Sequence, residues 1–200
     1  MIATLKTRLR FVVAASVLAL VTACETAPPA PVYPDITFNH LPTINLAVSS
    51  VSVQQTYTAP LTDPNIEHSM PGAPLDAAAR WVTDRVRATG NNGTATFTLK
   101  EMSVKEVPLE KKTGVVGAFT TDQSERYDAV IEATVSITDP SRNAKGSAVA
   151  RAERSITVAE DATLNERDQV LFGLAEKLMA DFNAELERNI RANLSEWVTP

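Results

Sequence analysis

The sequence predicts an α+β fold: a four-stranded mixed sheet in β-α-β-β-β-α order, with two helices packed on one face. Two stretches carry most of this prediction. Residues 127–138 alternate between apolar and polar side chains, which is the period of a half-buried strand. Residues 164–197 place apolar side chains three or four positions apart, which is the period of a helix. A sheet with one buried face needs helices as cover, and this gives a two-layer domain.

The first strand is predicted over residues 44–57. Apolar and polar side chains alternate from Ile44 onward, and the alternation changes register at Ser49 and Ser50. An extra residue in a strand produces such a change, so we expect a β-bulge there. Residues 58–74 contain four prolines and are expected to form an irregular loop.

The first helix is predicted over residues 75–89. Pro74 suits its start, and Gly90 suits its end. One face of a 3.6-residue period is formed by Leu75, Ala78, Ala79, Val82 and Val86.

Three further strands are predicted over residues 94–107, 127–138 and 146–158. The first of them changes register near Lys100 and Glu101, which indicates a second bulge.

Arg154 breaks the pattern of the last strand. It shares the helix-facing side with Ala152 and Ile156. A buried guanidinium without a partner is very costly in free energy. We therefore expect either a bulge that turns Arg154 outward, which is the commoner arrangement, or an acidic partner.

The final helix begins with a capping box, in which Thr163 is followed three residues later by Glu166. At 1.5 Å per residue, residues 164–197 would span about 51 Å, long enough to lie along most of the sheet. Gly173 is where we expect a bend. The apolar stripe comprises Leu171, Leu174, Leu178, Phe182, Leu186, Ile190, Leu194 and Trp197.

The beginning of the chain has the pattern of a signal peptide. Lys6, Arg8 and Arg10 form a positive segment, and residues 11–21 contain only Ser16 as a polar residue. A membrane-spanning helix needs about 20 apolar residues, so this stretch is too short for one. A buried core helix would be the alternative, but it would carry a polar face.

Val21, Thr22, Ala23 and Cys24 complete this segment, and Cys24 is the only Cys in the chain. An aliphatic residue, two small residues and Cys resemble the lipobox of bacterial lipoproteins, although Val is less frequent than Leu at the first position. The resemblance implies that Cys24 receives a diacylglycerol, that cleavage occurs before Cys24, and that its new amine is acylated. The alternative is an ordinary secretory peptide with an incidental Cys.

Residue 25 is Glu rather than Asp, and Asp at this position resembles an inner-membrane retention signal. Glu25 therefore favours the outer membrane, with the protein facing the periplasm. Cleavage would remove three basic and no acidic residues, leaving 16 basic and 24 acidic residues and a net charge of −8. Such a surface gains nothing from anionic headgroups, so lipids on Cys24 would hold the protein to the membrane.

We expect three parts: a lipoprotein signal peptide over residues 1–23, a lipidated Cys with a Pro-rich tether over 24–42, and a single periplasmic α+β domain over 43–200. Five of the twelve prolines lie in the tether. Pro-rich chain is semi-rigid, so this spacer could reach roughly 50 Å. A ligand for a proline-binding module is the less favoured interpretation.

Composition and motifs argue against an enzyme. The net charge of −5 gives no reason to expect a nucleic acid partner, and one Cys with two His is too few for a Cys/His zinc cluster. The sequence contains no G-x-S-x-G, P-loop or H-E-x-x-H motif. Glu67 and His68 form a lone acid-imidazole pair, which is more simply explained as part of a solvated loop. We expect no catalytic residues, no cofactor and no metal.

The lipobox, the tether and the β-α-β-β-β-α order together resemble a recurrent plan of outer-membrane lipoproteins. The order is similar to the lipoprotein partner of the lipopolysaccharide translocon. It is also similar to auxiliary lipoproteins of ABC-type lipid and solvent transport systems. The former typically carries a disulfide, which one Cys cannot form, so the second group is the preferred analogue.

These features predict a non-enzymatic accessory or interaction component of the cell envelope with a protein partner, in line with an ABC-type transport role. The alternative is a lipid- or small-molecule-binding carrier, with a cavity lined by residues such as Phe97, Ile131 and Phe182. A periplasmic hydrolase would need a convergent polar site, which the sequence does not show.

The connection over residues 108–126 is the strongest candidate for a partner contact. A short hairpin needs only two to five residues, and this connection is far longer. It places Val115, Val116 and Phe119 at its tip. These side chains either fold back as cover for the core or stay exposed and contact a partner groove or the membrane surface, and the sequence leaves both alternatives open.

Overall fold

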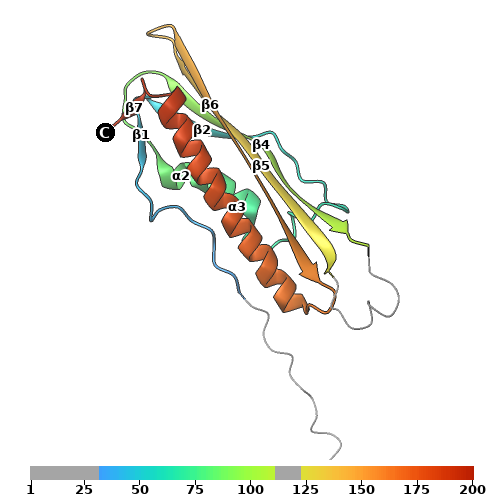
Figure 1. Cartoon of the computed structure of the whole chain (residues 1–200). Helices are drawn as coiled ribbons and strands as arrows, with labels where there is room; N and C mark the ends of the chain where they lie inside the picture. The colour runs from blue at the N-terminus through green and yellow to red at the C-terminus, as the bar shows by residue number, and fades with distance from the viewer. Residues whose placement is uncertain (1–31, 111–122) are drawn as a thin grey trace, which may run out of the picture. The chain divides into compact units, whose positions relative to one another are not determined.

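The computed structural model describes residues 32–110 and 123–200, which form an α+β fold with two helices and a four-stranded mixed sheet (Figure 1). The predicted fold class is therefore confirmed. A three-stranded sheet, which the sequence analysis did not predict, adds to it. We call the three-stranded sheet sheet A and the four-stranded sheet sheet B.

Sheet B has the strand order β2-β4-β5-β6. Strand β2 is parallel to β4, and the other two pairs are antiparallel. The bulge expected near Lys100 is confirmed by a register shift between Leu99 and Glu101. The four strands are β2 (Ser50–Gln55), β4 (Thr94–Pro108), β5 (Gln123–Asp139) and β6 (Ala144–Ala159).

Sheet A corrects the prediction of one bulged strand over residues 44–57. The chain instead forms β1 (Ile44–Leu46) in sheet A and β2 in sheet B. Strand β1 pairs with β3 (Val86–Ala88) on one side and β7 (Val198–Thr199) on the other. The register change at Ser49 and Ser50 is therefore the point where the chain passes from one sheet to the other.

The first helix is shorter than predicted and turns a different face to the core. Helix α2 (Pro74–Arg85) ends before Val86 because residues 86–88 pair with β1 as a parallel strand. Of the predicted stripe, Leu75 is only partly buried, whereas Trp81, which lies outside that stripe, is fully buried. The hydrophobic face therefore centres on an aromatic residue that the predicted stripe omitted.

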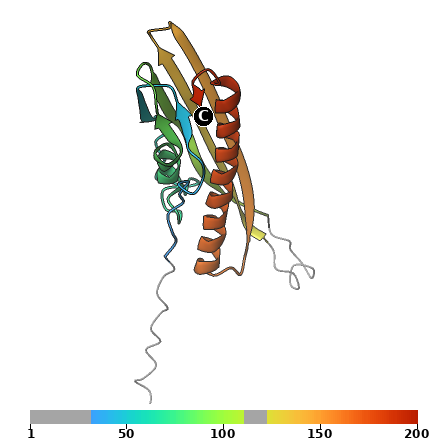
Figure 2. The ribbon, with the colours of Figure 1, turned by 90° about the vertical axis from the view of Figure 1, so that its left-hand side faces the viewer.

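Helix α3 (Leu164–Asn193) runs along β5 and β6 (Figure 2). Its predicted capping box is present: Thr163 Oγ1 accepts from Glu166 N at 3.3 Å, and Glu166 Oε2 accepts from Thr163 N at 2.8 Å. The helix ends four residues earlier than predicted. All eight residues of the predicted stripe are nevertheless buried, including Leu194 and Trp197 beyond the helix end.

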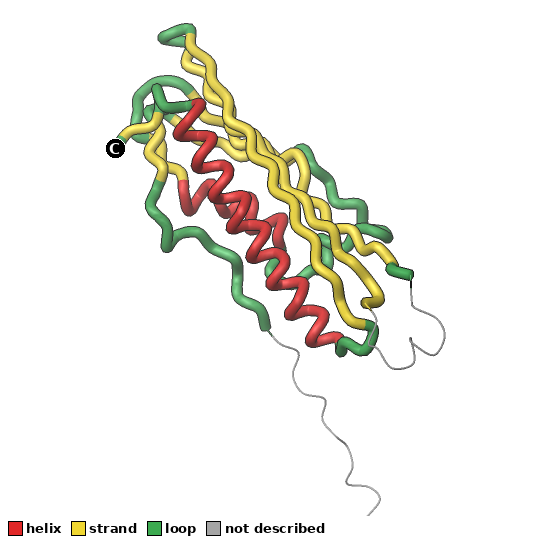
Figure 3. Tube along the Cα trace, in the orientation of Figure 1, coloured by secondary structure: helices red, strands yellow, loops and turns green. Residues whose placement is uncertain are grey.

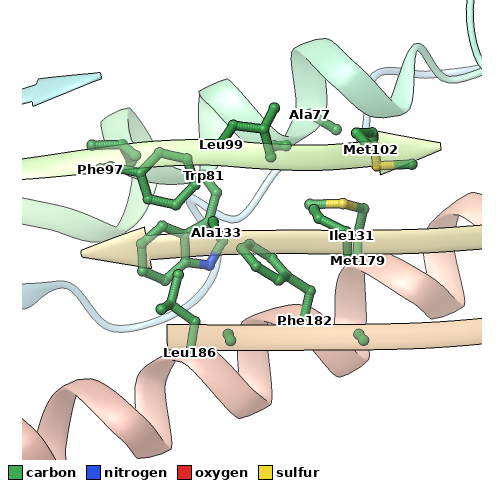
Figure 4. Packing of buried hydrophobic residues seen from close by; sticks show 14 of the residues in the cluster. Ala77, Trp81, Phe97, Leu99, Met102, Ile131, Ala133, Met179, Phe182 and Leu186 are labelled. Atoms are coloured by element: carbon green, nitrogen blue, oxygen red, sulfur yellow. The ribbon is translucent and has the colours of Figure 1, made fainter. Parts of the chain in front are cut away.

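Three aromatic rings occupy the space between the helices and sheet B (Figure 4). Trp81 from α2 stacks on Phe97 from β4, with ring centroids 6.0 Å apart. Phe182 from α3 meets both rings edge-on, at 6.3 Å from Trp81 and 6.4 Å from Phe97. Such offset and edge-to-face pairs add stability beyond the apolar area they bury. Both helices therefore pack on the same face of the sheet.

The expectation of a bulge at Arg154 is wrong. Arg154 pairs in regular register with Ala129 and lies on the helix-facing side of β6. Its Nε and Nη2 donate to Asp181 of α3 at 2.5 and 3.1 Å. Because β6 is the edge strand, the guanidinium reaches past the sheet to this carboxylate and stays partly exposed. The structure therefore has the second arrangement expected, an acidic partner for Arg154.

Residues 32–41, which the sequence analysis assigned to the tether, pack against the domain as an extended loop (Figure 3). We call them the N-terminal strap. Ile36 and Phe38 are buried in the core. The strap is held to α2 by two hydrogen bonds: Arg80 Nη1 donates to Ile36 O at 3.0 Å, and Phe38 N donates to Asp84 Oδ2 at 2.7 Å.

Candidate functional site

Four residues singled out from the sequence lie outside the described residues. Cys24 is one, and the loop residues Val115, Val116 and Phe119 are the others. Their roles therefore stay predictions.

The residues expected to line a carrier cavity form part of the packed core instead. Phe97, Ile131 and Phe182 are all buried, and the rings of Phe97 and Phe182 are in direct contact. A well-packed interior leaves few voids larger than a water molecule. The space that the carrier alternative would use at this level is therefore filled by side chains.

A pocket of about 340 Å³ lies between the N-terminal strap and α3. His40 of the strap lines it together with Glu176 and Asn183. Among the described residues, no group of three His, Cys, Asp or Glu side chains could hold a metal ion.

Glu67 is the least expected polar residue of the interior, because its side chain lies in the loop before α2 yet is only 3% exposed. Its carboxylate accepts hydrogen bonds from the Tyr57 hydroxyl at 2.5 Å and from Val104 N at 3.0 Å. Asn65 Nδ2 donates to both carboxylate oxygens at 3.2 and 3.3 Å. His68 beside it is exposed.

This cluster has a structural explanation. A buried carboxylate is stable only when hydrogen bonds satisfy it, and three donors do so here. Burial, together with the hydrogen bond to Glu67, raises the pKa of the Tyr57 phenol, so Tyr57 remains a donor at neutral pH. The backbone beside it is tied to β4, since Ile66 N donates to Val104 O at 2.9 Å. Glu67 therefore joins the loop before α2 to strand β4 through its hydrogen bond from Val104 N.

The face of sheet B opposite the helices is the larger candidate for recognition, and we call it the open face. Its side chains are mostly hydroxylic or charged. Serines of β2 donate to threonines of β4: Ser50 to Thr94 at 3.3 Å, and Ser52 to Thr96 at 3.2 Å. The alternation along the strands places on this face Thr98, Glu101, Glu132, Thr134, Ser136, Ser147, Arg151 and Glu153.

Arg151 is the centre of a charge network on the open face. Its Nη1 contacts Glu101 Oε2 at 2.9 Å and Glu132 Oε2 at 3.1 Å, and its Nε donates to Glu153 Oε1 at 2.8 Å. Lys100 Nζ lies 3.8 Å from Glu132 Oε1. One guanidinium thus connects carboxylates from β4, β5 and β6.

The network fixes the charge state of its members. Hydrogen bonds to Glu101, Glu153 and Glu132 raise the pKa of Arg151. Burial tends to raise the pKa of Glu101, but hydrogen bonds from Arg151 and Ser103 outweigh it and lower that pKa. Arg151 and Glu101 are therefore charged at neutral pH.

The sequence analysis missed the Arg151 network, although the strand pattern held a signal for it. It placed Glu67 in a solvated loop, which is wrong for this buried carboxylate. Glu132 and Arg151 each occupy an outward position in a cleanly alternating strand, so antiparallel pairing would place them side by side. The Glu67 cluster had no such signal, because it joins a Pro-rich loop to the backbone of a distant strand.

No protein-family model and no curated protein matches this chain. Similar solved structures include the rare lipoprotein B of Shewanella oneidensis, with 10% identity, a TM-score of 0.36, and coverage of 70% of this chain and 92% of that chain. A DUF330 protein of Xanthomonas campestris has 12% identity and a TM-score of 0.33, and the match covers 84% of this chain and 95% of that chain. The PelC dodecamer of Paraburkholderia phytofirmans has 16% identity and a TM-score of 0.20, and the match covers 76% of this chain and 92% of that chain. One of these structures is thus that of a lipoprotein, but TM-scores at this level assign this chain no family.

Proposed function

We propose that this chain is a lipid-anchored, non-enzymatic lipoprotein that faces the periplasm from the outer membrane and docks onto another envelope component. The lipobox-like sequence from Val21 to Cys24, at the end of the only signal-peptide-like segment, carries this proposal. A role beside an ABC-type transport system is the specific form that we favour, from the order of the secondary-structure elements.

The packing of the N-terminal strap supports a short connection to the membrane. Tyr33 packs against Phe172 of α3, with ring centroids 5.0 Å apart, so the chain joins the folded domain at about residue 32. From Cys24 to Val32, eight peptide steps can span at most about 30 Å. Within residues 32–110 and 123–200, no helix has the length and hydropathy needed to cross a membrane. Because the span from Cys24 to Val32 is short, lipids on Cys24 would hold the domain close to the surface.

The chemistry of the two polar clusters supports a docking role rather than catalysis. The buried carboxylate of Glu67 has its acceptors occupied by Tyr57, Asn65 and the backbone of Val104. The charges around Arg151 are held in mutual ion pairs. A broad polar sheet face with preformed ion pairs provides specificity for a complementary protein surface.

The anchor is tested by Cys24→Ser. We expect this variant to remain as uncleaved precursor or to leave the outer-membrane fraction, because without the thiol no diacylglycerol can be attached. Membrane fractionation with metabolic labelling by a radioactive fatty acid measures both effects. Glu25→Asp is the matched control, which should keep the label and change only the membrane that retains the protein. A Cys24→Ser protein that fractionates like the wild type would contradict the proposal.

The docking surface is tested with a photo-crosslinking amino acid in living cells. Placed at Ser147 on the open face, it should capture a discrete partner, whereas the same probe at exposed Lys177 of α3 should not. Equal capture from both positions would contradict docking through the open face.

We also propose that Val115, Val116 and Phe119 contact the partner. The double variant Val116→Asp and Phe119→Ser should then abolish crosslinking and leave the melting temperature unchanged. Thr120→Ser with Thr121→Ser, in the same segment, should preserve both. A melting temperature lowered by several degrees would instead identify the three residues as cover for the core.

A further inference from the structure

The two edges of sheet B differ in how well they are protected. Helix α3 packs along β6, where Asn189 Nδ2 donates to Val149 O at 2.7 Å. The Arg154–Asp181 ion pair also joins this edge strand to the helix. Strand β6 further carries the charged residues Lys145 and Arg151. Charged side chains and a covering helix are the usual means by which proteins prevent an edge strand from pairing with another chain.

Strand β2, the opposite edge, has none of these protections. Its sequence, SVSVQQ, contains no charge and no proline, and its register with β4 is regular from Ser50 to Gln55. Every residue except Val51 is exposed. On the side away from β4, no hydrogen bond from the described residues reaches its backbone. Among the described residues, the backbone N–H and C=O groups on this side of β2 are thus left unpaired.

The neighbouring parts of the same edge are closed by the chain itself. Strand β1 is covered by β7, and Ala47 N donates to Trp197 O at 2.7 Å. Beyond β2, Asn65 takes the place beside Lys105 of β4. The open stretch is therefore confined to β2 and flanked on both sides by paired backbone.

We propose that β2 pairs with β2 of a second copy of this chain, antiparallel about a two-fold axis, to form a continuous eight-stranded sheet. The strand is complementary to itself. With Ser52 opposite Ser52 of the second copy, Val51 lies opposite Val53 on the helix-facing side, and Ser50 lies opposite Gln54 on the open face. Val–Val cross-strand pairs are favourable, and this pairing brings no like charges together.

Val53 gives this pairing a hydrophobic contribution. Its side chain is 45% exposed, and the pairing would bury it against Val51 of the second copy. A contact through one six-residue strand is small, so the dimer is of the weak class that favours a high local concentration. Because the axis is perpendicular to the sheet, the two open faces join into one surface.

Cysteine crosslinking of the full chain in native membranes tests the pairing and its register. In the proposed register, the two Ser52 Cα atoms lie within the span of a disulfide, about 4.4–6.8 Å. Ser52→Cys should therefore give a disulfide-linked homodimer after mild copper oxidation. Gln54→Cys should give no dimer, because its two copies would lie four residues apart along the strands. Ser147→Cys on β6, the protected edge strand, should give none either.

A second pair of variants separates strand pairing from chance collision. Val53→Lys, added to Ser52→Cys, should abolish the dimer because it places two ammonium groups in the interface. Val149→Lys is the matched control, since Val149 is also 45% exposed but lies on β6, and it should leave the dimer unchanged. Wild-type chain is oxidised in parallel, because a dimer there would report a free Cys24 thiol and count against the lipid anchor only.

The proposal would be overturned by a Ser52→Cys dimer no stronger than that of Ser147→Cys, or by a dimer that survives Val53→Lys. A crosslinked product that contains a different protein would also overturn it, because β2 would then accept a foreign strand.

Discussion

Replacing Glu187 by Leu is expected to lower the free energy of unfolding by about 3–5 kcal/mol, because it leaves a buried guanidinium without its carboxylate. Arg85 is only 1% exposed, and its Nη2 donates to Glu187 Oε2. Glu187 also accepts from Arg191 at 2.8 Å, so it joins a buried and an exposed cation. Urea unfolding followed by tryptophan fluorescence measures the effect.

Two variants serve as controls for this prediction. Glu185→Gln removes an exposed pair with Arg188 on the same helix and should cost less than about 1 kcal/mol. The double variant Arg85→Met with Glu187→Leu should recover much of the loss, since a well-packed apolar pair often replaces a buried ion pair without cost. A Glu187→Leu protein as stable as Glu185→Gln would show that Arg85 finds other compensation.

The same pair has a pH dependence with a defined sign. Burial tends to raise the pKa of Glu187, but the hydrogen bonds from Arg191 and Arg85 outweigh it and lower that pKa below its ordinary value of 4.5. A lowered pKa in the folded state means that the carboxylate contributes stability above pH 4.5. This contribution is lost as the pH falls through the lowered pKa.

Gly90→Ala is expected to cost roughly 3 kcal/mol, which corresponds to a fall of roughly 6–12 °C in melting temperature. A Cβ at Gly90 would lie 2.5 Å from the carbonyl carbon of Ala47 and 2.8 Å from Val48 N. These are backbone atoms of the segment between β1 and β2, so no side-chain rotation can relieve the clash. Calorimetry of the purified variant measures the shift.

Gly173→Ala is the matched control for Gly90. It lies inside α3, and apart from the neighbouring backbone of the helix itself, a Cβ there would meet no atom within 4 Å. We expect it to stabilise the protein by about 0.5–1 kcal/mol, because Ala loses less conformational entropy than Gly in a helix. Equal effects at the two positions would show that close backbone approach is not what requires Gly90.

The elements that could be predicted from the sequence are those whose signal is local and repeated. The strands β5 and β6 and the helix α3 each show their period over more than ten residues, and the predicted apolar stripe of α3 is buried throughout. The bulge near Lys100 was visible for the same reason. Local periodicity reports burial directly when one face of an element is covered.

Sheet A could not be predicted because it has almost no local signal. Its strands contain only two or three residues, and their pairing joins Asn45 to Thr199 across most of the chain. Residues 86–88 continued an apparently helical pattern, and only their partner β1 makes them a strand. Pairing with a distant segment therefore overrode the local preference at this point.

The polar side-chain contacts could be predicted only in part from the sequence, for a related reason. The outward positions of Glu132 and Arg151 follow from alternation, but Arg85 resembles an ordinary charged residue at a helix end. Glu187 likewise has the spacing of a solvated pair with Arg191, and that pair exists alongside the buried one. Only the packing of α2 against α3 gives this carboxylate its second partner.

The central position of β1 also has a consequence for the order of folding. Strands β5 and β6 are neighbours in the sequence and can meet as soon as both are available, whereas β1 must wait for residues 198–199. Contacts between distant residues form late, because closing a long loop costs entropy before any contact compensates for it. During synthesis, the segment around β1 would therefore stay without its β7 partner until the strand at 198–199 has emerged.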